Sequence, residues 1–367
     1  MSDITRTAGY IVAGQVTQRR DTVDPAYCVG EGKLNEIEKT IKESAIEVVI
    51  FTRQLSAGQM FRIGKKFGGT VRVLDRNMLI LEVFDKRSAT TEAKLQIELA
   101  KLRYTFSWGR ESVRMRGIVS EQMGRGGPGQ YPYQIYESMT RKRISKIEQE
   151  LRKIRSKKAH LRKHREKSGF QTVALTGYTQ SGKTTLFNRL TSETKEIGMG
   201  PFTTLSTFAR KVPMPSQRKG TNSFILIDSI GFIEDLSPLL LNAFHTTLNE
   251  LSNSDLILLF VDGSENIANV KRKITTCHQV MKQEINHVPI LICLNKADLT
   301  TREHLDKVSE EIRRVFKEEE IVEISSKTGT HIQELLQKIA TRLSKPLSHP
   351  IHEKPSSGSQ SQTTTSK

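Results

Sequence analysis

Cysteine and long apolar runs are both scarce in this sequence. The three cysteines, Cys28, Cys277 and Cys293, lie far apart and have no metal-ligand spacing, so neither a disulfide framework nor a cysteine-ligated metal centre is expected. No run approaches the roughly 20 apolar residues of a membrane-spanning helix. The first ten residues also lack the apolar centre of a signal peptide. We therefore expect a cytoplasmic protein without an integral membrane segment.

Acidic residues are in short supply as well. The chain of 367 residues has 57 Lys and Arg against 40 Asp and Glu, so its formal net charge is +17 at pH 7. Hydrophobic residues make up 36% of the chain, which is enough for packed cores in two or three domains. A positive surplus of this size predicts a polyanionic partner, either a nucleic acid or an acidic membrane surface.

The N-terminal part alternates short apolar runs with helical stretches. The apolar runs at 10–16, 47–51 and 70–75 predict strands, and the periodicity of 33–45 and 55–67 predicts helices. Alternation of this kind is typical of a small parallel α/β unit.

Two long helices are expected in the middle of the chain, over about 87–105 and over 135–167. Each has an apolar face, formed by Leu95, Leu99, Leu102 and Phe106 on the first and by Ile144, Ile147, Leu151, Ile154 and Leu161 on the second. Between them, residues 123–132 are too rich in glycine and proline for a helix or a central strand. Two helices joined in this way predict an antiparallel coiled-coil hairpin.

The second half alternates nearly continuous apolar strands with helices, which predicts a parallel sheet covered on both faces. The final segment is rich in serine and threonine and has little to bury, so we expect it to be disordered. The expected division is an α/β subdomain at 1–85, a basic hairpin at 86–168 with a glycine-rich loop at 124–130, a nucleotide-binding domain at 169–344 and a tail at 345–367.

The segment GYTQSGKT at 177–184 has the pattern G-x-x-x-x-G-K-[ST] and lies between an expected strand and an expected helix. Its glycines let backbone N–H groups turn toward a phosphate, and the N-terminus of the helix reinforces them. Lys183 would reach the β- and γ-phosphates of a nucleotide, and the Thr184 hydroxyl would bind Mg²⁺. The predicted contacts are Gly177, Tyr178, Thr179, Gln180, Ser181, Gly182, Lys183, Thr184 and Thr185.

Two further motifs predict the base. NKAD at 295–298 ends an apolar strand, and Asp298 can accept hydrogen bonds from the ring N–H and the exocyclic amine of guanine, which adenine cannot supply in the same arrangement. Asn295 and Lys296 would brace the phosphate loop and cover the base. The segment SSK comprises Ser325, Ser326 and Lys327, and one of its backbone N–H groups would bind the guanine O6.

Two candidate switch segments lie between these motifs. Asp228 in DSIG, 228–231, ends an expected strand and would hold Mg²⁺ through water, while the Gly231 N–H would contact the γ-phosphate. Thr204 is preferred over Thr203 as the residue that completes the Mg²⁺ shell. The residues expected to act in hydrolysis are Lys183, Thr204 and Gly231, and the remaining switch contacts are Phe202, Thr203, Ser229 and Ile230.

With these motifs in their usual order, the chain resembles the HflX GTPases. The resemblance implies that the nucleotide-binding domain is a Ras-like P-loop domain. The likeness reaches to about residue 345 and includes GYT-x-x-GKTTLFN at 177–188 and DSIGFI at 228–233. It also covers VTQRRD at 16–21, GEGK at 30–33, RVLDRNMLILEVFDKR at 72–87, AKLQIELAKL at 93–102 and RGGPG at 125–129. The resemblance implies a GTPase that binds the large ribosomal subunit with its N-terminal domain near the peptidyl-transferase region. In bacteria the family is associated with splitting stalled ribosomes.

Phe232 stands where Ras-like enzymes have a glutamine that orients the attacking water. A phenyl ring can neither donate nor accept that hydrogen bond, so we expect slow intrinsic turnover that a large-subunit surface accelerates. The resemblance implies that this phenylalanine is a family trait. The chain departs from the bacterial pattern at Ser206 and Thr207, which replace an Asp-Pro pair, and at Gln130, Tyr131 and Tyr133 after the glycine-rich loop.

Much of the positive charge lies in the second long helix. Residues 141–167 contain thirteen Lys or Arg and three Glu, which is +10 of the +17. A charged helix is usually a solvated surface, but charge of one sign beside a glycine-rich loop favours contact with RNA phosphates. The RNA-contact candidates are Arg125, Arg141, Lys142, Arg143, Lys157, Lys158, Arg162 and Lys163.

Several functions fit these features. One is a monomeric GTPase that splits or rescues ribosomes, and another is a factor for assembly of the large subunit. A third is an RNA-binding module gated by GTP, in which hydrolysis is vestigial. A membrane-surface GTPase is disfavoured, because the hairpin has no Trp/Phe-rich amphipathic face and the chain has no lipidation motif.

Overall fold

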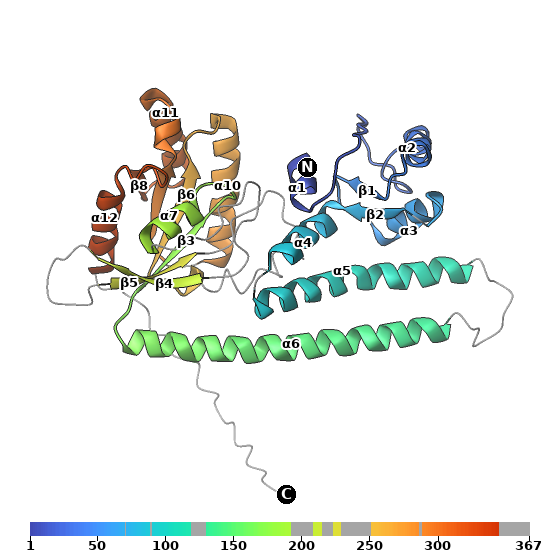
Figure 1. Ribbon diagram of the computed structural model, residues 1–367, viewed down its shortest axis with the longest axis horizontal. Helices are drawn as coiled ribbons and strands as arrows, with labels where there is room; N and C mark the ends of the chain where they lie inside the picture. Colours follow the sequence, from blue (N-terminus) through green and yellow to red (C-terminus); the bar gives the residue numbers. More distant parts are fainter. Residues whose placement is uncertain are drawn as a thin grey trace, which may run out of the picture.

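The computed structural model describes residues 1–69, 71–88, 90–118, 130–191, 208–214, 223–228, 251–285 and 288–344. The predicted disordered tail at 345–367 and all but the last residue of the predicted glycine-rich loop lie outside these ranges. Figure 1 shows a small N-terminal α/β unit, a long helical hairpin and a larger α/β domain.

The N-terminal unit is built on two short parallel strands, in which Val48 lies opposite Arg72. This pairing confirms the predicted parallel α/β unit. Its elements are α1 (Ser2–Thr7), α2 (Glu31–Ser44), β1 (Val48–Phe51), α3 (Ala57–Lys66), β2 (Arg72–Asp75) and α4 (Arg76–Arg87).

The strand predicted over 10–16 is wrong. The backbone there has no regular structure, and Ile11 is 95% exposed. Gly14 and Gln15 interrupt the apolar run, so the segment offers no continuous face to cover.

Helix α4 follows β2 directly and forms the centre of the N-terminal core. Asp75 caps it by accepting a hydrogen bond from the Met78 N–H at 2.9 Å. The side chains of Leu79, Ile80 and Leu81 are fully buried although they are consecutive. A helix buried on all sides lacks the one-sided periodicity by which helices are predicted.

The hairpin consists of α5 (Thr91–Ile118) and α6 (Gln130–Lys167), which run side by side in opposite directions (Figure 1). This confirms the predicted antiparallel hairpin. Leu95, Ile147 and Leu151 are buried in its seam, whereas Leu161 is 56% exposed.

Two boundaries of the hairpin were predicted incorrectly. Helix α5 continues to Ile118, beyond its expected end at about 105, and α6 begins earlier than expected. Residues 130–132 belong to α6, although 123–132 was expected to exclude a helix. Pro132 is the third residue of α6, where the missing N–H costs no hydrogen bond because the first turn has no intrahelical acceptors.

The C-terminal domain has a six-stranded sheet in the order β4-β5-β3-β6-β7-β8. All neighbouring strands are parallel except β4, which runs antiparallel to β5 and was not predicted. The strands are β3 (Thr172–Gly177), β4 (Phe208–Pro213), β5 (Ser223–Asp228), β6 (Leu256–Asp262), β7 (Ile290–Asn295) and β8 (Glu320–Glu323). The helices within the described residues are α7 (Lys183–Thr191), α10 (Ile267–Glu284), α11 (Arg302–Val315) and α12 (Ile332–Ser344), with a 3₁₀ turn η1 (Ala297–Leu299).

Both faces of this sheet are buried. In β6, Leu258 and Phe260 pack in the cluster formed with α7 and α12, whereas Ile257 and Leu259 pack in the cluster formed with α10 and α11. Successive side chains of a strand point to opposite faces, so a strand covered on both sides must be apolar throughout. Its charged residue, Asp262, comes at the carboxyl end.

Candidate nucleotide-binding site

Four predicted motifs meet at the carboxyl edge of the sheet. Gly177 ends β3, Asp228 ends β5 and Asn295 ends β7, while Ser325 follows β8. Ligands of open α/β sheets bind at this edge, where parallel strands end and loops begin. The topology therefore brings together residues up to 148 positions apart in the sequence.

The loop between β3 and α7 requires glycine at two positions. Gly177 has φ +131°, and a Cβ there would lie 2.4 Å from the Phe260 carbonyl oxygen. Gly182 has φ +96°, and a Cβ there would lie 2.1 Å from Asn295 Nδ2. Both the backbone conformation and the close packing exclude a side chain. The loop is thus pressed against β6 and β7, with its backbone free to surround a ligand.

Lys183 begins α7 and is buried beneath this loop, with 6% of its surface exposed. Its ammonium group donates to the carbonyl oxygens of Gly177 at 3.0 Å and Tyr178 at 2.6 Å. Burial lowers the pKa of Lys183 to about 8, and the nearby Asp228 carboxylate opposes this shift. A polyphosphate at the loop would place further anionic oxygens next to this buried cation.

Thr184 and Asp228 form a pair of oxygen donors beside Lys183. The Thr184 hydroxyl donates to Asp228 Oδ2 at 3.4 Å, and both residues are buried. Hydroxyl and carboxylate oxygens are the ligands that Mg²⁺ prefers. The pair therefore fits the predicted Mg²⁺ site, with Thr184 as a direct ligand and Asp228 acting through water.

Asn295 connects the phosphate loop to the SSK loop. Its amide donates to the Ser181 carbonyl oxygen at 2.7 Å, and its Oδ1 accepts from the Ser326 N–H at 2.8 Å. Asp298 lies in η1 and is exposed, so its carboxylate is available to a base. Lys327 is also exposed, whereas Ser325 is buried. The predicted base contacts thus lie in two neighbouring loops, after β7 and after β8, at the carboxyl edge of the sheet.

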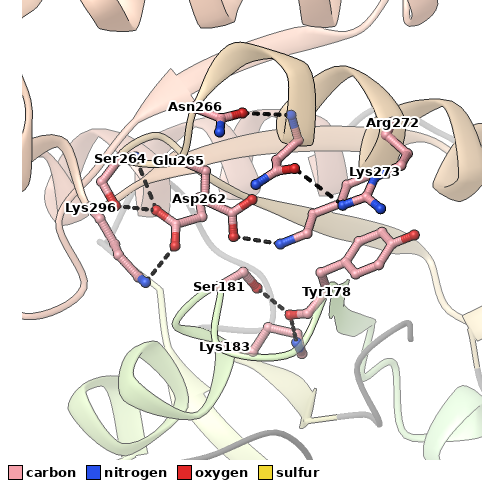
Figure 2. Close-up of polar contacts among 11 residues, drawn as sticks. Tyr178, Ser181, Lys183, Asp262, Ser264, Glu265, Asn266, Arg272, Lys273 and Lys296 are labelled. Carbon is pink, nitrogen blue, oxygen red and sulfur yellow. Dashed lines mark hydrogen bonds and ion pairs between the residues drawn. The ribbon is translucent and has the colours of Figure 1, made fainter. Parts of the chain in front are cut away.

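A second layer of charged residues holds these loops and was not predicted (Figure 2). Asp262 at the end of β6 pairs with Lys296 at 2.5 Å, and Glu265 pairs with Lys273 of α10 at 2.5 Å. The Lys273 ammonium lies 5.3 Å from the centre of the Tyr178 ring. The sequence signal that could have identified Asp262 is an acidic residue at the end of a buried strand, as at Asp228.

The switch predictions lie mostly outside the described residues. Only Asp228 of DSIG is placed, and Thr179, Gln180 and Thr185 are placed in or beside the phosphate loop. The predicted site residues without a described position are Phe202, Thr203, Thr204, Ser229, Ile230, Gly231 and Arg125. Phe232 is also outside the described ranges.

The predicted RNA contacts of the hairpin fall into two groups. Arg141 pairs with Glu137 at 2.5 Å, Arg143 binds both oxygens of Glu98 at 2.6 and 2.7 Å, and Lys158 pairs with Glu92 at 2.7 Å. These three cations are partly neutralised by the hairpin itself. The other described candidates are Lys142, Lys157, Arg162 and Lys163, which are exposed, as are Arg141 and Arg143. Among the described residues, Lys142, Lys157 and Lys163 make no ion pair.

Comparison with known proteins decides the family. Three family models match in succession: "GTP-binding GTPase N-terminal" over 1–85, "GTP-binding GTPase Middle Region" over 87–165 and "50S ribosome-binding GTPase" over 172–296. The GTPase HflX of Thermococcus kodakarensis is 35% identical over 94% of this chain and 77% of its own length. The GTPase HflX of Methanocaldococcus jannaschii is 40% identical over 79% of this chain and 70% of its own.

The chain belongs to the HflX GTPases. It binds guanine nucleotide and hydrolyses GTP, as this family does. A solved structure of SsGBP in complex with GDP covers 93% of both chains with a TM-score of 0.51 and 24% identity, which supports the fold alone. The predicted fold class, an α/β chain ending in a Ras-like P-loop domain, is confirmed. Across the part of this HflX chain that the structure describes, no helix has the length and apolar character to span a bilayer.

Proposed function

We propose that this HflX GTPase couples its nucleotide cycle to binding of the large ribosomal subunit, and that it splits or rescues ribosomes. The observation that carries the proposal is the exposed basic surface of α6 in a chain whose GTPase domain matches the 50S ribosome-binding family model. Ribosomal RNA is the polyanion that such a surface would contact. The protein would act as a cytoplasmic monomer that is partly ribosome-bound.

In the nucleotide site, Lys183 would hold the β- and γ-phosphates, and Thr184, Thr204 and water on Asp228 would hold Mg²⁺. The ion, when bound, would neutralise charge on the phosphate oxygens. The Gly231 N–H would sense the γ-phosphate, and Asp298 with the SSK loop would select guanine. Turnover would be slow without the ribosome, because Phe232 cannot orient water. Groups supplied by a partner contribute roughly 10³ to 10⁵ in rate in related enzymes.

In the hairpin, we assign RNA contact to the exposed cations Lys142, Lys157 and Lys163, with Arg162 and Arg125 as further candidates. Arg141, Arg143 and Lys158 would contribute less, because each pairs with a glutamate of the hairpin. The hairpin at 86–168, between the α/β subdomain at 1–85 and the GTPase domain at 169–344, would be the docking element.

Co-sedimentation with purified large subunits tests this proposal. We expect binding with a non-hydrolysable GTP analogue to exceed binding with GDP and to weaken steeply with salt. The triple variant K142E/K157E/K163E should lose most of this binding, whereas R143Q, whose cation is already paired, should lose less. Equal binding by the triple variant and the wild type would contradict the role of the hairpin.

The kind of particle distinguishes the alternatives. Binding to mature 70S ribosomes followed by release of the small subunit supports splitting. Binding confined to immature particles would instead indicate an assembly factor.

A further inference from the structure

The side chain of Arg189 in α7 contacts the loop that follows β8. Its Nε–H donates to the Ser326 carbonyl oxygen at 2.8 Å, and its Nη2 donates to the Lys327 carbonyl oxygen. A guanidinium group presents donors in a fixed planar arrangement, so it can hold two neighbouring carbonyls in one geometry. The loop held in this way is the one expected to contact the guanine O6.

The shape of the loop provides room for this contact. Gly329 has φ +95°, and a Cβ at this position would lie 2.8 Å from Arg189 Nη1. A larger residue would therefore be strained and would also push against the guanidinium group. Glycine at this position lets the loop close over Arg189.

Most backbone N–H groups of the loop already have acceptors. The Ser325 N–H donates to the Thr330 carbonyl oxygen, the Ser326 N–H to Asn295 Oδ1 and the Thr328 N–H to Ser325 Oγ. The Gly329 N–H donates to the Ser325 carbonyl oxygen. From 325 to 329, within the described structure, this leaves the Lys327 N–H as the group without an acceptor.

The Arg189 contact fixes the direction of this N–H. The Ser326 carbonyl and the Lys327 N–H belong to the same peptide group, which is planar. The described chain has no cis peptide bond, so the C=O and N–H bonds point in opposite directions. Holding the carbonyl oxygen on Arg189 therefore aims the N–H away from α7 and keeps the peptide from rotating.

We propose that Arg189 is a positioning residue for guanine recognition, and that it orients the Lys327 N–H toward the O6 of the base. The inference rests on the proposed role of 325–327 and deepens it, because it names the donor and the side chain that holds it. Asp298 would recognise the opposite side of the same ring edge, through the N1–H and the 2-amino group. The two contacts can therefore be separated by nucleotide analogues.

Three nucleotides separate the contacts in an equilibrium-binding assay on the full chain. GDP has both groups, 6-thio-GDP replaces the O6 with a weaker acceptor, and IDP lacks only the 2-amino group. The wild type should bind GDP more tightly than either analogue. In Arg189→Ala the preference for GDP over 6-thio-GDP should fall by about three- to tenfold, as expected for one hydrogen bond. The preference for GDP over IDP should stay the same.

Two further variants make the result decisive. Arg189→Lys keeps the charge and a donor but lacks the planar pair of donors that fixes two neighbouring carbonyls in one geometry, so it should lie between the wild type and the alanine variant. Arg302→Ala removes an arginine that pairs with Glu323 and Asp306 in the same domain, and it should leave both preferences unchanged.

Equal weakening of all three nucleotides in Arg189→Ala would show a purely structural role and overturn the proposal. So would a wild type that binds GDP and 6-thio-GDP equally. If the wild type bound no guanine nucleotide at all, the assigned nucleotide site itself would be wrong, and this outcome is distinct from the other two.

Discussion

Lys183 shows how one residue can link nucleotide binding to pH. It is buried under the phosphate loop and bound only to carbonyl oxygens that the structure describes, so desolvation lowers its pKa to about 8. Phosphate would favour the charged form and raise the pKa of this lysine in the complex. Above pH 8 the free protein would therefore have to take up a proton in order to bind.

We accordingly expect the affinity for GDP to be nearly constant between pH 6.5 and about pH 7.5, as Lys183 is then protonated in both states. As the pH rises past about 8, affinity should fall, approaching about tenfold per pH unit. Calorimetry in two buffers of different ionisation enthalpy should detect proton uptake at pH 9 and little at pH 7. In Lys183→Met this uptake should disappear, and uptake that persists there would assign it to another group.

Gly182 gives a second prediction for a single residue. An alanine Cβ would meet Asn295 Nδ2 at 2.1 Å in a backbone conformation that favours glycine. Gly182→Ala should weaken GDP binding at least about tenfold, since the loop and the Asn295 contacts cannot both be kept. Gly64→Ala is the control, because a Cβ in that part of α3 meets no atom within 4 Å. It should leave binding unchanged and raise stability by up to about 1 kcal/mol.

The sequence was sufficient to predict that the nucleotide-binding motifs lie at one edge of the sheet, because each has a fixed position relative to a strand. GKT, NKAD and SSK each follow a strand, and parallel strands place their ends at one edge. Asp262 shares with Asp228 a position at the end of a buried strand, but its pairing with Lys296 and the contacts of Lys273 and Arg189 could not be found in this way. Each of these three residues contacts a residue more than 30 positions away in the sequence, and no local pattern marks such a pair.

Secondary-structure elements were predicted well where one face is apolar and less well elsewhere. The hairpin was evident from its seam, and the strands of the sheet from their continuous apolar runs. Helix α4 was missed because all but one of its residues from Asn77 to Phe84 are buried, which removes the periodic signal. The strand expected at 10–16 failed for a different reason, since Gly14 and Gln15 interrupt its apolar run and Ile11 is exposed.

The hairpin seam can be tested by truncating its side chains. Leu151 is 3% exposed in the apolar cluster with Leu95 and Ile147. Leu151→Ala should lower the free energy of unfolding by about 2–4 kcal/mol, from lost burial and the cavity left behind. Leu161→Ala, at a position 56% exposed, should change it by less than about 0.5 kcal/mol. Urea denaturation followed by circular dichroism measures both, and equal effects would place the seam elsewhere.

At the scale of the whole molecule, the chain combines a GTPase domain with a basic hairpin. The predicted nucleotide site has groups suited to binding and polarising GTP, but the side chain of Phe232 can neither donate nor accept a hydrogen bond to water. The net charge of +17 is concentrated in α6, away from the motifs that bind nucleotide. A partner that is both an activator and a polyanion would satisfy both features, and the large ribosomal subunit is the partner we propose.

The most direct measurement is the rate of GTP turnover by the purified chain, alone and with purified large ribosomal subunits, at low and high salt. We predict slow turnover alone, strong stimulation by the subunits at low salt and loss of that stimulation as salt screens the hairpin. Turnover that stays flat while the subunits bind in a GTP-dependent way would contradict ribosome-stimulated hydrolysis and leave a GTP-gated binding module. If the subunits did not bind at all, the ribosome-directed function itself would be contradicted.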